Sequence, residues 1–167
     1  MSNLVDQLAK YASYHRDRRN ILTHLFGIPM IVLAVTVLLA RPVLADLGGH
    51  PINLAMIAAV ALAVYYLRLD LRLGAVMSGL LAVSVMAALH TTDLSTAAWL
   101  SCGLGLFVVG WIIQFLGHHY EGRKPAFVDD VVGLIIGPLF VVAEIAFLLG
   151  LRKDIEEAIT QKAGTVH

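Results

Sequence analysis

Long apolar runs separated by short polar segments dominate the pattern of the chain. Four of these runs predict membrane-crossing helices, because each approaches the roughly 20 residues that a bilayer core requires. Helices are expected throughout, since a lipid-exposed strand would leave backbone groups without hydrogen-bond partners. The predicted spans cover residues 21–40, 52–67, 73–89 and 97–116.

Two further segments complete the predicted fold. Apolar positions recur at helical spacing from Leu4 onward, so residues 3–16 are expected to form an amphipathic helix on the membrane surface. The last apolar run, residues 131–149, contains the pair Gly137 and Pro138. Because proline removes a helical hydrogen bond, we expect this fifth helix to be kinked or re-entrant.

The amino-acid composition is typical of an integral membrane protein. Apolar residues make up 59% of the chain and charged residues 14%, against roughly 45–50% and about 25% in soluble domains. The expected fold is therefore an all-α integral membrane bundle, with residues 1–167 as a single membrane domain. The net charge of zero gives no global field that would favour nucleic acid. Cys102 is the only cysteine, which excludes an internal disulfide and a cysteine-based zinc site.

The distribution of charge predicts the orientation in the membrane. If the spans alternate, the N-terminal stretch, the turn at Arg68 and the segment after Gly117 share one side and carry most of the Lys and Arg. The two opposite loops contain Arg41 alone. This asymmetry places the N-terminus in the cytoplasm. The corresponding membrane is the inner membrane of a bacterium or the endoplasmic reticulum of a eukaryote.

Polar side chains gather in two clusters at the ends of apolar runs. Such groups are costly at membrane depth and usually face the interior of a bundle. The predicted topology brings both clusters to the cytoplasmic end, which indicates a buried polar site that holds a metal ion. The clusters are Tyr14, His15, Asn20 and His24 in YHRDRRNILTHLFGIP, and Gln114, His118, His119 and Glu121 in WIIQFLGHHYEGRKP.

Helical spacing sets conditions on this site. Nine helical residues turn His15 half a circle away from His24, so the two converge only if the chain bends between them. Asn20 lies four residues before His24, which offers that histidine an amide neighbour that could fix its tautomer. Gln114 stands in the same relation to His118.

The other histidines have several interpretations. On a continuous helix His119 points about 100° away from His118, which leaves it as a ligand, a residue behind the ligands or an interface residue. His50, His90 and His167 are interpreted as interface residues. Glu144 is expected to pair with a buried cation or amide.

At these clusters the sequence resembles the membrane-bound 2-hydroxy fatty acid dioxygenases, over nearly the whole chain. The matching stretches are YH, N, H and IP within residues 14–29, WIIQFLGH ending at His118, and KPAFVDD followed by an apolar run with Gly137, Pro138 and Glu144. The sequence departs from this family at one place, because the segment after His118 is one residue shorter than in other members. This difference makes His119 an additional candidate ligand.

The resemblance implies an iron(II) enzyme that uses O₂ to shorten a 2-hydroxy fatty acid by one carbon, with release of CO₂, in contact with membrane lipids. Three imidazoles would leave octahedral positions free for the substrate and for O₂. The candidate ligands are His15, His24, His118 and His119. The candidate orienting or proton-handling residues are Tyr14, Asn20, Gln114, Glu121 and Asp129.

Two other classes of function stay open from the residues alone. Histidines on facing spans are common axial ligands of haem, so a haem-binding electron-transfer protein is one alternative. The second is a non-enzymatic lipid-binding membrane protein whose histidines contact lipid headgroups.

Overall fold

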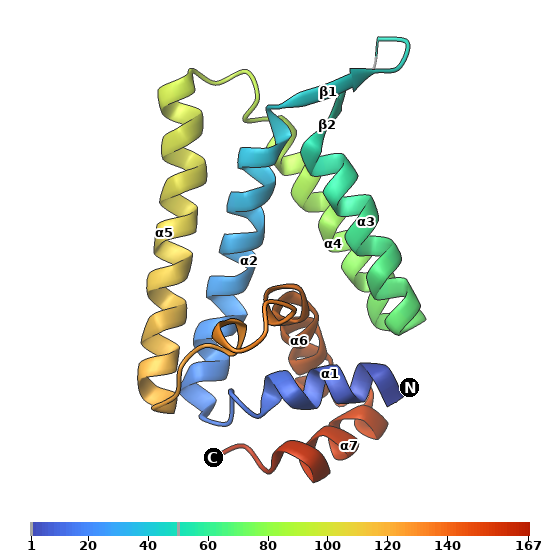
Figure 1. Cartoon of the computed structure of the whole chain (residues 1–167), viewed down its shortest axis with the longest axis vertical. Coiled ribbons are helices and arrows are strands. Elements are labelled where there is room, and N and C mark those ends of the chain that lie inside the picture. The colour runs from blue at the N-terminus through green and yellow to red at the C-terminus, as the bar shows by residue number, and fades with distance from the viewer. Residues whose placement is uncertain (1, 50) are drawn as a thin grey trace. The chain divides into compact units, whose positions relative to one another are not determined.

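The chain folds mainly into helices, and the computed structural model describes residues 2–49 and 51–167 (Figure 1). His50, which we interpreted as an interface residue, lies outside the described residues. The helices are α1 (Ser2–Ala12), α2 (Arg18–Ala40), α3 (Leu54–Leu69), α4 (Leu71–Leu89), α5 (Thr96–Glu121), α6 (Gly133–Leu148) and α7 (Lys153–Ala163), with a 3₁₀ turn η1 (Ala126–Val128). Two short strands, β1 (Val43–Asp46) and β2 (Pro51–Asn53), complete the fold.

The elements form two compact units. The first contains Met1–Ile28 and Trp111–His167, and the second contains Pro29–Gly110. Both α2 and α5 pass from one unit to the other. Every predicted site residue falls in the first unit.

Among the described residues, three helices are long and apolar enough to cross a membrane: α2, α4 and α5. Helix α3 is apolar but has only 16 residues. The prediction of an all-α fold with helices of membrane-crossing length is confirmed, and it is consistent with a membrane protein. The pair α6 and α7 would add a fourth crossing if it were one broken span. Four spans plus a fifth helix therefore stays a prediction.

The sharp bend of the last apolar segment lies after α6 and not at Pro138. Helix α6 continues through Pro138, and its axis makes an angle of 116° with that of α7. Gly150 ends α6 with a positive φ of 72°. Its amide donates to Phe147 O, and the Leu151 amide donates to Ala146 O, which is the Schellman pattern of helix termination. A left-handed glycine thus produces this bend, whereas a kink at Pro138 within the helix stays a prediction.

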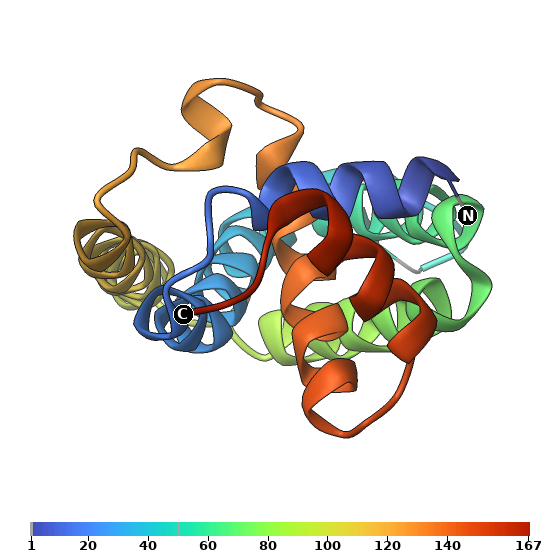
Figure 2. The same cartoon turned by 90° about the horizontal axis from the view of Figure 1, so that it is seen from below.

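Helix α1 is shorter than expected and ends at Ala12 instead of residue 16. Its apolar side chains, including Leu4 and Leu8, are buried. They lie against α6 and α7, and Figure 2 shows α1 beside α7. A location of α1 on the membrane surface stays a prediction. Because α1 ends early and α2 begins at Arg18, the chain bends between His15 and His24, as the spacing of these histidines required.

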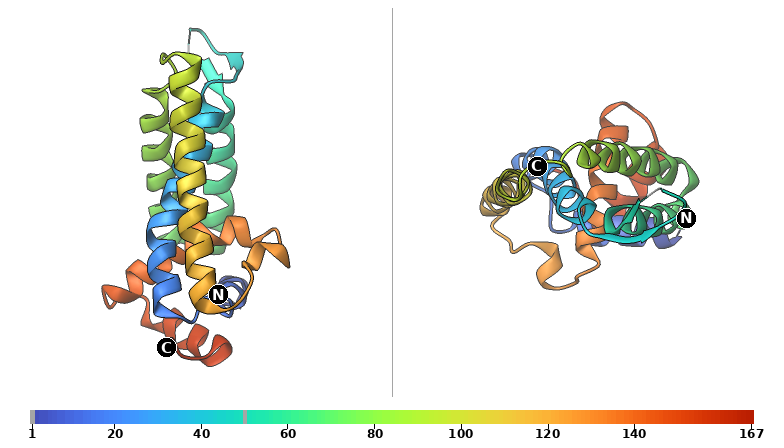
Figure 3. Two further views of the ribbon diagram at one scale, coloured as in Figure 1. Left: turned by 90° about the vertical axis from the view of Figure 1, so that its left-hand side faces the viewer. Right: turned by 90° about the horizontal axis from the view of Figure 1, so that it is seen from above.

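In the second unit, α3 and α4 lie side by side (Figures 1 and 3). Asp70 between them caps α4 by accepting from the amides of Arg72 and Leu73. The connection before α3 is an antiparallel β1–β2 hairpin where we expected only a loop. Positive φ angles at Gly48 and Gly49 allow its turn. The core of this unit contains Val37, Ala40, Ala55, Val85 and Ala88.

Candidate metal centre

Three of the predicted ligands meet inside the first unit. His15 follows α1, His24 lies in the first turns of α2, and His118 lies near the end of α5. All three are buried, with exposed fractions of 0%, 1% and 6%. One ring nitrogen from each lies within 4.8 Å of those from the other two. The structure therefore brings two distant parts of the sequence to one point.

The neutral rings of His15 and His24 together carry one proton fewer than their three close contacts require. His15 Nδ1 lies 2.7 Å from Tyr11 O, and His24 Nδ1 lies 2.8 Å from Asn20 O. Each carbonyl requires a proton on the nitrogen that faces it, which leaves both Nε2 atoms with lone pairs. These Nε2 atoms are 3.0 Å apart. Two neutral rings carry two protons, whereas the three contacts need three, so the pair needs one additional positive charge.

A metal ion supplies that charge better than a proton does. Burial, followed by the neighbouring His24, lowers the pKa of His15 well below its usual value, so this ring stays neutral at pH 7. Neutral imidazole nitrogens suit iron, zinc, copper and nickel. With metal–nitrogen bonds of about 2.0–2.1 Å, two ligands at right angles around one ion would lie about 3 Å apart. The separation of the His15 and His24 nitrogens thus fits two ligands of one divalent ion, and His118 offers a third nitrogen within 4.8 Å of both.

Glu121 ties the end of α5 to the start of α2. Its carboxylate accepts from the Arg16 amide at 2.9 Å, from the Asp17 amide at 2.8 Å and from Asn20 Nδ2 at 2.9 Å. A carboxylate in this place also complements the positive end of the α2 dipole. Glu121 therefore holds the segments that carry His15 and His24 against the one that carries His118.

Gly117 allows α5 to approach α2 closely beside His118. A Cβ atom at this position would lie 2.0 Å from Thr23 Oγ1 and 2.5 Å from Asn20 Oδ1. No side chain larger than hydrogen fits unless the side chains of Thr23 and Asn20, or the helices themselves, move. Sequence reasoning missed this residue. A glycine directly after a predicted span and directly before a candidate ligand is the signal that could have identified it.

The predicted amide neighbours of the histidines behave differently from expectation. The contact to His24 comes from the backbone carbonyl of Asn20, while the Asn20 side chain donates to Glu121 and to Tyr14 O. Gln114 is 4% exposed, and its Nε2 has no hydrogen-bond partner among the described residues. Gln114 is thus a buried donor one helical turn from His118.

Tyr14 and Asp129 lie at a more exposed position. Tyr14 Oη donates to Asp129 at 2.8 Å, and Lys124 Nζ contacts the other oxygen of that carboxylate at 2.6 Å. The contact with Lys124 lowers the pKa of Asp129 most, and the contact with Tyr14 lowers it further. This network links the turn after α1 to the segment before α6.

The remaining histidines lie apart from the cluster. His119 is exposed at the end of α5, next to Tyr120, and the structure does not bring it to the other three. His90 is the C-cap of α4 in the second unit. His167 pairs through its backbone with Arg16 and Arg18. Glu144 interacts electrostatically with the buried Arg16.

Comparison with known proteins identifies the family of the chain. Residues 1–149 match the family described as Mpo1-like, 2-hydroxy-palmitic acid dioxygenase Mpo1-like. The chain is 33% identical over 161 residues to the 2-hydroxy-palmitic acid dioxygenase MPO1 of Saccharomyces cerevisiae, covering 94% of this chain and 87% of the relative. No solved structure matches the chain. With helices capable of crossing a membrane and a match over most of its length, the chain belongs to the Mpo1-like family of 2-hydroxy-palmitic acid dioxygenases.

Proposed function

We propose that this chain is an iron(II)-dependent dioxygenase of 2-hydroxy fatty acids. The reaction consumes one 2-hydroxy acid and one O₂, and it yields the acid with one carbon fewer, one CO₂ and one water. Atoms balance in this form without a further reductant. Membership of a dioxygenase family supports the reaction class, and the three buried histidines support the requirement for a metal.

The pair of facing Nε2 atoms on His15 and His24 carries the proposal. Their separation of 3.0 Å supports a cation shared by two neutral rings, which we propose is the metal ion. A separation this short is incompatible with His15 and His24 as the two axial ligands of a haem, because axial ligands lie on opposite faces of the haem and do not touch. His118 would supply the third imidazole ligand.

The residues around the cluster have separate roles in this proposal. Iron(II), when bound, would offer positions for the hydroxyl and carboxylate of the substrate and for O₂. The Tyr11 and Asn20 carbonyls hold the proton of each ring at Nδ1 and leave Nε2 free. Glu121 keeps the two ligand-bearing segments together. Burial of the three histidines excludes bulk water.

Three further residues have roles in the proposal. One would bind the substrate, and two would position the turn that carries His15. Gln114 Nε2 is a buried free donor and would bind a polar oxygen of the substrate head. Tyr14 and Asp129 would orient the turn that carries His15, through the hydrogen bond between them. His119 receives no ligand role, because it lies outside the cluster.

The acyl tail of the substrate would come directly from the bilayer. Large apolar side chains of α2 and α5 in the first unit are exposed, including Phe26, Ile112 and Phe115. Such side chains on helices of membrane-crossing length are expected to contact lipid. A long-chain substrate that shares the lipid phase would need no passage through water.

A direct assay tests the proposal. The detergent-solubilised chain, loaded with iron(II), is incubated with 2-hydroxypalmitic acid, and O₂ uptake and fatty acid products are measured. We expect a C15 fatty acid in a one-to-one ratio with O₂, and no turnover of palmitic acid, which lacks the hydroxyl. Metal-free protein with full activity would contradict the proposal. Binding of the acid without turnover would favour a lipid-binding protein, and a haem absorbance band would favour electron transfer.

A further inference from the structure

We propose that Tyr11 is the positioning residue of His15, since its ring and its carbonyl together set the direction of the His15 Nε2 lone pair. This inference rests on the proposed metal centre. It adds a residue that neither the sequence pattern nor the ligand set identifies.

Tyr11 contacts His15 in two independent ways. The two rings stack with centroids 4.3 Å apart and planes only 7° from parallel. The Tyr11 carbonyl also accepts from His15 Nδ1 at 2.7 Å. Stacking fixes the plane of the imidazole, while the hydrogen bond fixes its rotation within that plane. Together they determine where Nε2 points.

Helix α6 in turn fixes the Tyr11 ring. Phe140 lies 5.0 Å from the Tyr11 ring and 5.6 Å from the His15 ring, measured between centroids. At Gly137 the backbone of α6 leaves space for the Tyr11 hydroxyl, and an added Cβ would lie 3.0 Å from Tyr11 Oη and 3.5 Å from Cζ. The tyrosine is thus enclosed between His15 and α6.

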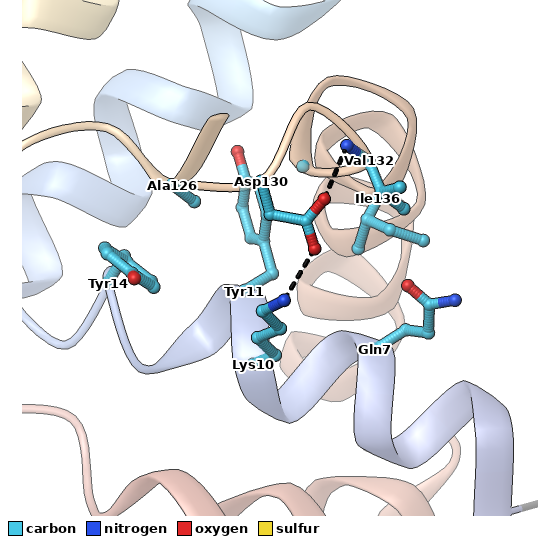
Figure 4. Close-up of a pocket in the computed structure, with 9 residues that line it drawn as sticks. Gln7, Lys10, Tyr11, Tyr14, Ala126, Asp130, Val132 and Ile136 are labelled. Carbon is cyan, nitrogen blue, oxygen red and sulfur yellow. Dashed lines mark hydrogen bonds and ion pairs between the residues drawn. The ribbon is translucent and has the colours of Figure 1, made fainter. Parts of the chain in front are cut away.

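The remaining space around Tyr11 is small. Figure 4 shows Tyr11 projecting from α1 towards Ala126 and Asp130, where it lines a cavity of about 20 Å³. This volume holds about one water molecule. The Lys10–Asp130 ion pair, 2.6 Å long, lies in the wall of the same cavity. The ring therefore has little room to tilt away from His15.

Cobalt(II) binding tests this role without any measurement of turnover. The metal-free, full-length chain in detergent is titrated with Co²⁺ alone, and the visible absorption of bound cobalt reports both affinity and ligand geometry. Residues that orient metal ligands typically contribute about 10–100-fold in affinity. We expect Tyr11→Leu to weaken cobalt binding by about this factor and to change the absorption spectrum, while Tyr11→Phe keeps both close to wild type.

Leu4→Ala is the matched control. Leu4 is buried on the same helix, so its truncation removes core packing and lowers the midpoint of thermal unfolding. A purely structural role for Tyr11 predicts that both variants lower this midpoint and leave the cobalt affinity unchanged. Our inference predicts a loss of affinity for Tyr11→Leu only.

A second pair of variants covers the case in which Tyr11→Leu fails to fold. Gly137→Ala places a methyl group 3.0 Å from the Tyr11 hydroxyl and 3.1 Å from Ile28 Cδ1, so it should shift the Tyr11 ring and weaken cobalt binding by less than Tyr11→Leu does. Adding Tyr11→Phe removes that hydroxyl and should restore the affinity. If the wild type binds cobalt and both Gly137→Ala and Tyr11→Leu keep its affinity, the role of Tyr11 is overturned while the metal centre stands. A wild type that binds no cobalt would overturn the metal centre itself.

Discussion

At the scale of single residues, the first unit contains a local conflict that the proposed metal ion would resolve. Three imidazoles share a buried space, and two of them direct lone pairs at each other at 3.0 Å. In the metal-free chain this arrangement costs free energy, because buried polar atoms without a partner are destabilising. An ion that binds only the folded state stabilises the fold through its binding free energy.

Replacement of one ligand tests the role of the cluster. His24→Ala should abolish activity and reduce bound metal to background, because two imidazoles hold an ion far less tightly than three. His90→Ala is the control, since it also removes one histidine but lies at the end of α4 in the second unit. Metal analysis of both purified variants provides the measurement. Equal metal content in the two would exclude His24 as a ligand.

Glu121→Gln tests the tie between the segments. In the wild type, the charged carboxylate accepts hydrogen bonds from two backbone amides and from Asn20. The substitution replaces this carboxylate with a neutral amide. Hydrogen bonds to a charged group contribute about 1.5–3 kcal/mol, so we expect a loss of this order in the free energy of unfolding. Metal affinity should fall by about 10-fold or more. Denaturant unfolding with and without metal separates the two effects, and an unchanged midpoint would count against this role.

At the scale of elements, the close approach of α2 and α5 positions His118. Gly117→Ala should separate the helices locally, because the new Cβ would overlap Thr23 Oγ1. Overpacking typically costs about 1–3 kcal/mol, and metal binding should weaken with it. Gly105→Ala on the same helix is the control, since its Cβ meets no atom within 4 Å. Ala favours helix over Gly by about 1 kcal/mol, so Gly105→Ala should be neutral or stabilising in a thermal melt.

The sequence predicts the elements and the meeting point of the histidines better than it predicts the element ends. Apolar run length indicates α2, α4 and α5, and the His15–His24 spacing requires a bend. Hydropathy does not show that α1 stops at Ala12 or that Gly150 ends α6, because these depend on local backbone hydrogen bonds. The hairpin before α3 is formed mostly by exposed residues, so it leaves no burial pattern to detect.

The contacts around the ligands are the least predictable part. The stacking of Tyr11 on His15 depends on how the chain leaves α1, and the closeness of Gly117 to Thr23 arises only when α2 and α5 are packed together. Candidate ligands stand out because polar groups in apolar runs are rare. Residues that orient them are ordinary in sequence and acquire their role from tertiary contacts. That both units form a single membrane domain stays a prediction.

At the scale of the whole molecule, the buried His15 couples folding to pH. Burial lowers its pKa in the folded state below the value of about 6.5 in the unfolded state. Below pH 6.5 the unfolded chain therefore binds more protons, and the stability of the metal-free protein should fall as the pH decreases. Thermal unfolding midpoints of metal-free protein between pH 8 and pH 5 measure this effect. His15→Gln should flatten the dependence, and an unchanged slope in that variant would contradict the assignment.

We propose that His15, His24 and His118 together bind one iron ion. Anomalous diffraction at the iron edge, from crystals of the protein purified with iron(II), tests it most directly. Our account predicts a single peak within bonding distance of one nitrogen from each of the three rings. A peak bound elsewhere, or no peak between these three rings, would contradict it.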